Sequence, residues 1–156
     1  AKAAAAMGYG AVKYADLKNN RLTDYKFSFD SMLDLKGDTA VYLLYAHARI
    51  ASILAKSGKD PASLAKGGAQ VVLGEPEERA LATHLAMLPE VLAATLDELA
   101  INKVCSYAYD LTVKFTAMYT KHNISGSDSR LQLVEATAMT FRTCFKLLGI
   151  TPLYKI

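Results

Sequence analysis

The sequence contains no tryptophan, two cysteines and four prolines among its 156 residues. Because hydrophobic residues make up 52% of the chain, its composition argues against a disordered or fibrous protein and predicts one compact globular domain. Charged residues interrupt the longest apolar runs well before the roughly 18 residues that a membrane-spanning helix needs. The alanine-rich opening also lacks the apolar core of a signal peptide. These absences predict a soluble, intracellular protein.

Sequence signatures of a nucleotide-binding or hydrolytic site, such as GxxxxGK(S/T) or GxSxG, are missing as well. The histidines His47, His84 and His122 are dispersed, with no cysteine or carboxylate at ligand spacing, so we expect no metal site. Cys105 and Cys144 lie inside apolar helical patterns, which is typical of reduced core thiols rather than of a disulfide. We therefore expect no catalytic residue, no metal and no cofactor in this chain.

Charge is unevenly distributed along the chain. Residues 1–74 carry a net charge of +4, residues 75–100 carry −5, and residues 101–156 carry +4, which together give the net charge of +3. Both ends are therefore basic while the middle is acidic. An anionic partner should avoid the middle of the chain.

Four segments show the 3.6-residue period of an amphipathic helix. The first is expected to begin with Asp38 as its N-cap and to end before the helix breakers Gly58 and Pro61. The second begins at Pro76, which suits a first helical position, and is kinked or restarted at Pro89.

The third and fourth segments carry long apolar stripes with spacings of three and four residues. The stripes consist of Ile101, Val104, Ala108, Leu111, Phe115 and Met118, and of Leu131, Val134, Ala138, Phe141, Phe145 and Leu148. A short polar loop separates them, so the two helices should pack as an antiparallel pair. Residues 25–30 alternate in polarity and predict a short extended connector. The expected fold class is all-α, a helical bundle preceded by an N-terminal helical piece.

The helix that follows Asp38 has an unusual polar face. Its members, at spacings of three and four, are Tyr42, Tyr45, Arg49, Ser52 and Lys56. Aromatic rings beside cationic groups suit unpaired bases, because any base can stack on a ring while Arg and Lys hold the phosphates. The alternative interpretation is that both tyrosines are half-buried packing residues with their hydroxyls in water.

Other polar and aromatic residues receive structural interpretations. Glu77, Glu78 and Glu90 are interpreted as a solvated helix face. Tyr107 and Tyr109 are interpreted as core residues. Composition and spacing alone therefore indicate a helical bundle and leave both interpretations of its polar face open.

The order of motifs resembles the C-terminal part of arginyl-tRNA synthetases. The motifs are "GYGAVKYADLKNNRLTDYKFSFDSML", "GDTAVYLLYAHARI", "EERAL", "CSYAYDLTVKFTAMY" and "RLQLVEATAMTFRTCFKLLGITPLYKI". Together they cover residues 8–156, and "AVKYADL", "YLLYAHARI" and "EAT…LLGI" are the most specific of them.

The resemblance implies that residues 25–156 form the helical anticodon-binding (DALR) domain of a class I synthetase, with residues 1–24 as the terminal helix of the upstream catalytic domain. Members of the family ligate arginine to its tRNA with ATP and magnesium in that upstream domain. Its "HIGH"-like and "KMSKS"-like signatures are absent here, so this chain alone should be non-catalytic. The implied partners are the anticodon stem-loop of tRNA(Arg) and the upstream domain, with no membrane.

The resemblance also implies particular tRNA-binding residues. They are Tyr42 and Tyr45 at the anticodon-loop surface, the motif's Arg49, the loop-supporting Tyr119 and the chain end Ile156, to which the polar face adds Lys56. Leu44 stands where many members have glutamine, a change expected to alter how a base is hydrogen-bonded.

Two functions remain open from the sequence. The first is anticodon recognition as part of an arginine–tRNA ligase, in the cytoplasm or in an organelle. The second is a non-catalytic scaffolding subunit that retains the helical domain without the catalytic one.

Overall fold

The fold is known from a computed structural model that describes residues 2–59, 63 and 70–156. Helices are the only regular elements in this part of the chain, as the all-α expectation required. They are α1 (Lys2–Leu17), α2 (Phe29–Met32), α3 (Ala40–Ser57), α5 (Pro76–Ala86), α6 (Leu88–Glu98), α7 (Asn102–Lys121) and α8 (Asp128–Leu148). The predicted helix breaker Pro61 lies outside the described residues.

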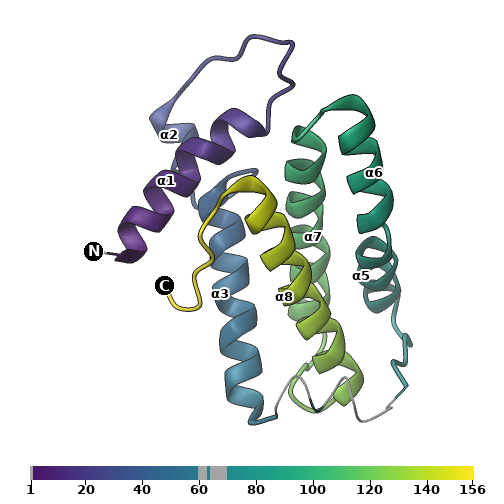
Figure 1. Cartoon of the computed structure of the whole chain (residues 1–156). Coiled ribbons are helices and arrows are strands. Elements are labelled where there is room, and N and C mark those ends of the chain that lie inside the picture. Colours follow the sequence, from purple (N-terminus) through teal and green to yellow (C-terminus); the bar gives the residue numbers. More distant parts are fainter. Residues whose placement is uncertain (1, 60–62, 64–69) are drawn as a thin grey trace.

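The long helices α3, α7 and α8 run side by side and form the centre of the bundle (Figure 1). Helices α5 and α6 pack against α7, and α1 crosses the end of the bundle where α3 begins. After α8 the chain turns back as an irregular tail, residues 149–156, on the side of α3. The polar face of α3 and the tail are thereby brought to the same part of the surface.

The predicted apolar stripes of α7 and α8 form the core. All their residues are buried except Ile101, which is half-buried. The rings of Phe141 and Phe145 stack with centroids 5.7 Å apart, and both side chains are fully enclosed. The two thiols also lie in this core, where burial raises the pKa values of Cys105 and Cys144 to about 12 and keeps them as inert thiols.

Helix ends follow the sequence with two corrections. The N-cap of α3 is Thr39, whose hydroxyl accepts a hydrogen bond from the amide of Tyr42, so the prediction of Asp38 was wrong by one residue. Gly58 ends α3 in the left-handed conformation, as predicted. Of the predicted connector, residues 25–28 lie outside any helix, whereas residues 29–30 belong to the one-turn helix α2, which Ser28 caps.

Asp38 instead joins α1 to the start of α3. The buried hydroxyl of Tyr14 donates a hydrogen bond of 2.6 Å to the Asp38 carboxylate, and Lys18 donates one of 2.7 Å to the Asp38 carbonyl. Burial is the main reason why the pKa of Tyr14 is raised, so this hydroxyl keeps its proton. Helix α1 is therefore tied to the residue that precedes the cap of α3.

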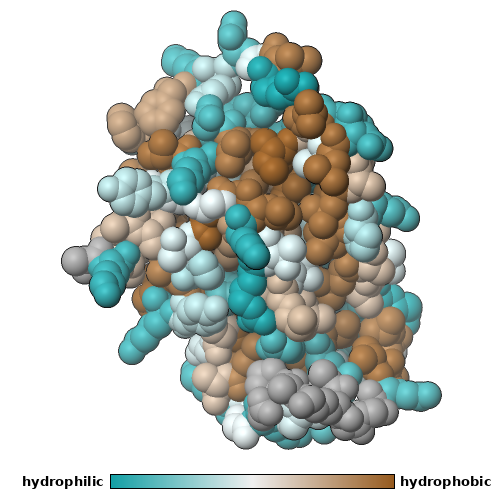
Figure 2. Space-filling model, in the orientation of Figure 1, coloured by the Kyte–Doolittle hydropathy of each residue, from teal (hydrophilic) through white to brown (hydrophobic). Residues whose placement is uncertain are grey.

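Helix α6 is the least enclosed part of the bundle. The helical segment is interrupted at Met87, just before Pro89, as the sequence predicted. None of the residues of α6 is buried. Figure 2 shows apolar surface gathered over the part of the bundle where α6, α7 and α8 lie together. Leu96 and Leu99 contribute large exposed side chains at the end of α6. None of the described helices is both long enough and apolar enough to cross a membrane.

Phe141→Ala should lower the free energy of unfolding by about 3 to 5 kcal/mol, because it removes a fully buried ring and leaves a cavity among close-packed neighbours. Denaturant unfolding measures the change. Met139→Ala, an exposed position on the same helix, is the control and should be close to neutral. Similar effects at the two positions would contradict the assignment of Phe141 to the core.

Candidate nucleic-acid interface

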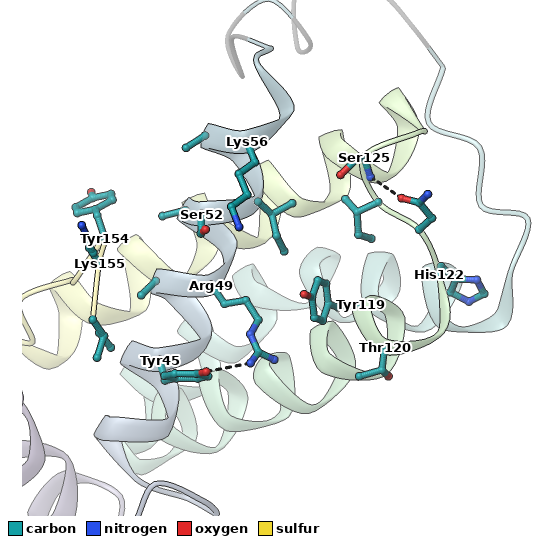
Figure 3. A pocket seen from close by; sticks show the side chains of 17 residues that line it. Tyr45, Arg49, Ser52, Lys56, Tyr119, Thr120, His122, Ser125, Tyr154 and Lys155 are labelled. Atoms are coloured by element: carbon teal, nitrogen blue, oxygen red, sulfur yellow. Dashed lines mark hydrogen bonds between the residues drawn. The ribbon is translucent and has the colours of Figure 1, made fainter.

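A shallow groove of about 1070 Å³ lies over the polar face of α3. Its floor is α3, one side is the end of α7 with the loop that follows, and the other side is the C-terminal tail. Figure 3 shows Tyr45, Arg49, Ser52 and Lys56 along α3, with Tyr119 on one side and the tail on the other. Segments that are about 100 residues apart in the sequence therefore meet at one surface.

Arg49 is held between two aromatic rings. Its guanidinium carbon lies 5.0 Å from the ring centroid of Tyr45 and 5.3 Å from that of Tyr119. Arg49 also donates a hydrogen bond of 3.1 Å to the hydroxyl of Tyr45. Cation–π attraction orients the guanidinium without neutralising its charge. The Tyr45 side chain remains 47% exposed, which leaves ring surface free for another planar group.

The tail adds further aromatic and cationic side chains on the other side of the groove. Tyr154, Lys155 and Ile156 line the groove, and all three side chains are exposed. The groove thus combines three tyrosines with Arg49 and the two lysines Lys56 and Lys155. Rings and cations in this arrangement suit a flexible polyanion with unstacked planar groups, which describes single-stranded nucleic acid.

Five of the six residues predicted from the sequence line this groove: Tyr45, Arg49, Lys56, Tyr119 and Ile156. Tyr42 lies apart from them, half-buried, with its ring centroid 6.2 Å from that of Tyr109. Leu44 is fully buried and does not line the groove, so the expected effect on base hydrogen bonding was wrong.

Sequence reasoning missed several groove residues. Tyr154 and Lys155 directly precede the predicted Ile156, so their position in the chain was a usable signal. The residues after α7 gave a weaker sequence signal. They are His122, Asn123, Ile124 and Ser125, which follow Tyr119 by about one turn.

Glu77 fastens the end of α7. Its carboxylate accepts hydrogen bonds from Lys121 and, at 3.1 Å, from His122. The hydrogen bonds from Lys121 and then His122 lower the pKa of Glu77 to about 2, so it stays ionised at all ordinary pH values. The interpretation of Glu77 as part of a solvated helix face was therefore wrong. Glu77 supports one side of the groove.

Glu78 departs further from the predicted solvated face, because its side chain is buried. One carboxylate oxygen accepts a 2.6 Å hydrogen bond from Nε of Arg130, and the other accepts a 3.0 Å bond from the Glu75 amide. Burial alone would raise the pKa of Glu78, but the bonds from Arg130 and Glu75 outweigh it and the pKa is lowered. Arg130 also donates to the carbonyl of Asn123, so this pair positions the loop beside the groove.

The contacts of His84 are structural. His84 and Tyr107 stack with centroids 4.3 Å apart, and the Tyr107 hydroxyl donates to the His84 carbonyl. Tyr107 is buried, as predicted, whereas Tyr109 is only half-buried. Within the described ranges, histidines, cysteines and carboxylates form no cluster that could hold a metal ion.

Comparison with known protein families adds a second line of evidence. The sequence model of the "DALR anticodon binding domain" matches residues 43–156, which is most of the chain and includes every residue of the groove. The chain belongs to the DALR anticodon-binding domain family. A second model, "tRNA synthetases class I (R), catalytic domain", matches residues 1–29.

Curated relatives of this DALR domain include two proteins of Arabidopsis thaliana. The chain is 56% identical to the chloroplastic/mitochondrial arginine–tRNA ligase and 54% identical to the cytoplasmic one, in each case over 98% of its length. It spans only 24% and 26% of those proteins. The chain thus covers about a quarter of the length of the curated relatives that it matches.

Solved structures share the fold. The arginyl-tRNA synthetase of Plasmodium falciparum superimposes with a TM-score of 0.88 at 36% identity, over 97% of this chain and 27% of that one. The Thermus thermophilus arginyl-tRNA synthetase gives a TM-score of 0.85 at 27% identity, over 99% and 27%. The helical bundle of the DALR family is therefore present nearly end to end.

Glu78→Gln should destabilise the DALR domain by about 3 kcal/mol at neutral pH, because it leaves Arg130 without its buried carboxylate. The lowered pKa means that the ionised Glu78 stabilises the fold above its ordinary value of 4.5 and that this contribution is lost as the pH falls through the folded pKa. The difference between wild type and variant should therefore shrink below pH 4.5, as measured by denaturant unfolding across pH.

Glu90→Gln, at an exposed position early in α6, is the matched control. It should change stability little at any pH. Equal stabilities of the Glu78 and Glu90 variants at pH 7 would show that the buried pair does not support the fold.

Proposed function

We propose that this chain recognises the anticodon stem-loop of tRNA(Arg) as the C-terminal part of an arginine–tRNA ligase. The observation that carries this function is Arg49 oriented between Tyr45 and Tyr119 on the floor of an open groove with two further lysines. The family, the names of the relatives and the chemistry of the groove all favour the same ligand.

Physical chemistry explains why an anticodon loop suits this surface. Loop bases are unpaired and can stack on tyrosine rings, whereas a duplex offers mainly its backbone and groove edges. Arg49, Lys56 and Lys155 can neutralise the phosphates of a short single-stranded segment. Tyr45, Tyr119 and Ile156 are assigned to base contact, and Tyr42 to the margin of the surface because it lies outside the groove.

We assign catalysis to a part of the protein upstream of this segment. Residues 1–24 are taken as the terminal helix of the catalytic domain and residues 25–156 as the anticodon-binding domain, in keeping with the catalytic-domain match to residues 1–29. ATP and magnesium would act in that upstream domain. We expect the 156-residue chain alone to form neither arginyl-adenylate nor arginyl-tRNA.

The names of the relatives indicate two alternative cellular compartments for the protein. One of the two Arabidopsis relatives is named cytoplasmic and the other chloroplastic/mitochondrial. We propose the cytoplasm, with an organelle as the alternative. A scaffolding role, the second function considered from the sequence, has no observation of its own in its favour.

Tyr45→Ala should weaken binding of a tRNA(Arg) anticodon stem-loop by about 1 to 3 kcal/mol, the range for losing one base-stacking ring. Thermal stability should change little, because Tyr45 is already half exposed. Fluorescence titration and thermal melting measure the two effects. Tyr9→Ala removes an exposed tyrosine of α1 outside the groove and should leave RNA affinity unchanged. Equal affinity of the two variants would show that Tyr45 makes no base contact.

Binding should depend steeply on salt and should favour the stem-loop over a perfect duplex of equal length, since stacking needs unpaired bases. Removing one phosphate contact by Lys56→Ala should reduce the slope of log K against log salt by about 0.7. Titrations of both RNAs at several salt concentrations test this. Equal affinity for the two RNAs would reduce the surface to a generic basic patch, and no binding to either would favour the scaffolding role.

A further inference from the structure

The last three residues of the tail, which form one wall of the groove, are not held there by their own burial. Tyr154 is 58% exposed and Ile156 is 55% exposed. The tail begins securely, because Ile150 is buried and its amide donates to the Phe145 carbonyl at 2.8 Å. The three residues that line the groove lie four or more residues beyond that anchor. Leu153, half-buried against the core, brings the chain close to the bundle, and a further contact at this residue is needed to set the direction of the three that follow.

His47 supplies that contact from beneath the floor of the groove. Its ring is only 1% exposed, and Nδ1 lies 2.7 Å from the carbonyl oxygen of Leu153. Because a carbonyl can only accept, Nδ1 carries the proton and donates it. The same ring packs edge-to-face on Tyr154, with centroids 5.1 Å apart.

The His47 ring is itself immobilised by the core. It packs edge-to-face on Phe145 and Phe141 of α8, with centroid distances of 5.6 and 6.4 Å. The enclosed His47 ring thus donates a hydrogen bond to Leu153 and packs against Tyr154. The direction of the chain from Leu153 onward is thereby set relative to α3.

We propose that His47 is a positioning residue that latches the C-terminal tail onto α3 and so builds the tail wall of the RNA-binding groove. One residue, Ala46, separates it from Tyr45 on the same helix, and the two side chains serve opposite faces. Tyr45 lies in the groove, while His47 holds Tyr154, Lys155 and Ile156 beside it from within. The effect of His47 on RNA binding presupposes the function proposed above, whereas its effect on the tail does not.

The latch should weaken in mild acid. Burial is the main reason why the pKa of His47 lies below its ordinary value of 6.5; Arg142 lowers it too, while the Leu153 carbonyl and Glu135 act in the opposite direction. Arg142 and Glu135 both belong to α8, and Tyr154 is the titratable group that the tail itself presents. An undocked tail exposes the ring and brings the pKa of His47 back toward its ordinary value. Docking is therefore fully favoured above pH 6.5 and loses stability as the pH falls below it.

Two substitutions separate the hydrogen bond from packing. His47→Leu fills the site without a donor, and His47→Asn places an amide donor near the position of Nδ1. The order of the tail is measured in the RNA-free 156-residue chain by the backbone ¹⁵N heteronuclear NOE of residues 153–156, at pH 7.5 and 5.5. Affinity for a tRNA(Arg) anticodon stem-loop is measured in parallel, also for chains that end at Leu153.

We expect the wild-type tail to be ordered at pH 7.5 and more mobile at pH 5.5. His47→Leu should make it mobile at both values and weaken RNA binding about tenfold. His47→Asn should restore order without the dependence on pH. In chains that end at Leu153, His47→Leu should cause no further loss of affinity, since the wall it positions is already gone.

Three outcomes would overturn the latch. They are an ordered tail in His47→Leu, a mobile tail with unchanged RNA affinity, and an equal loss of affinity in the full-length and shortened chains. If the wild-type chain binds no RNA, the proposed function fails, and the NOE measurements still decide whether His47 fixes the tail. Thermal melting tests whether each variant folds. If His47→Leu does not fold, tail order is compared between the wild type and His47→Asn at the two pH values instead.

Discussion

The packing of α3 is the constraint on which the rest of the structure depends. Leu43, Leu44 and Ile50 are fully buried, and α3 packs against α1, α7 and α8. Since side chains three or four positions apart share a face of a helix, this burial forces Tyr45 and Arg49 outward in register. One helix therefore serves as part of the core and as the floor of the groove. A rotation of α3 that moved the groove residues would have to break the core first.

Sequence reasoning succeeded where a structural feature is periodic and local. The stripes containing Phe141 and Leu111 could be predicted because one face of a helix repeats every three or four residues. The N-cap of α3 was misplaced because Asp38 and Thr39 are adjacent and both suit that position. The choice between them depends on Tyr14, 24 residues earlier, which engages the carboxylate of Asp38 and leaves Thr39 to cap the helix.

The rest of the site could not be predicted because its contacts join distant segments through groups without a sequence signature. His47 acts on a backbone carbonyl 106 residues away, and every residue offers such an acceptor. Glu78 and Arg130 are 52 residues apart, and a pattern of acidic residues at the start of a helix gives no indication that one of them is buried. For both, the tertiary fold selected one partner from many chemically equivalent ones.

The charge of the groove depends on how cations are held in place. Carboxylates of α5 engage Lys121, His122 and Arg130, so the acidic middle of the chain supports one side of the groove and neutralises the charges of Lys121 and Arg130. Arg49 is oriented by two aromatic rings instead, and among the described ion pairs none gives it a carboxylate partner. A carboxylate at position 119 would fix the guanidinium equally well but would cancel its charge. Rings provide the same orientation while leaving the positive charge available to a phosphate.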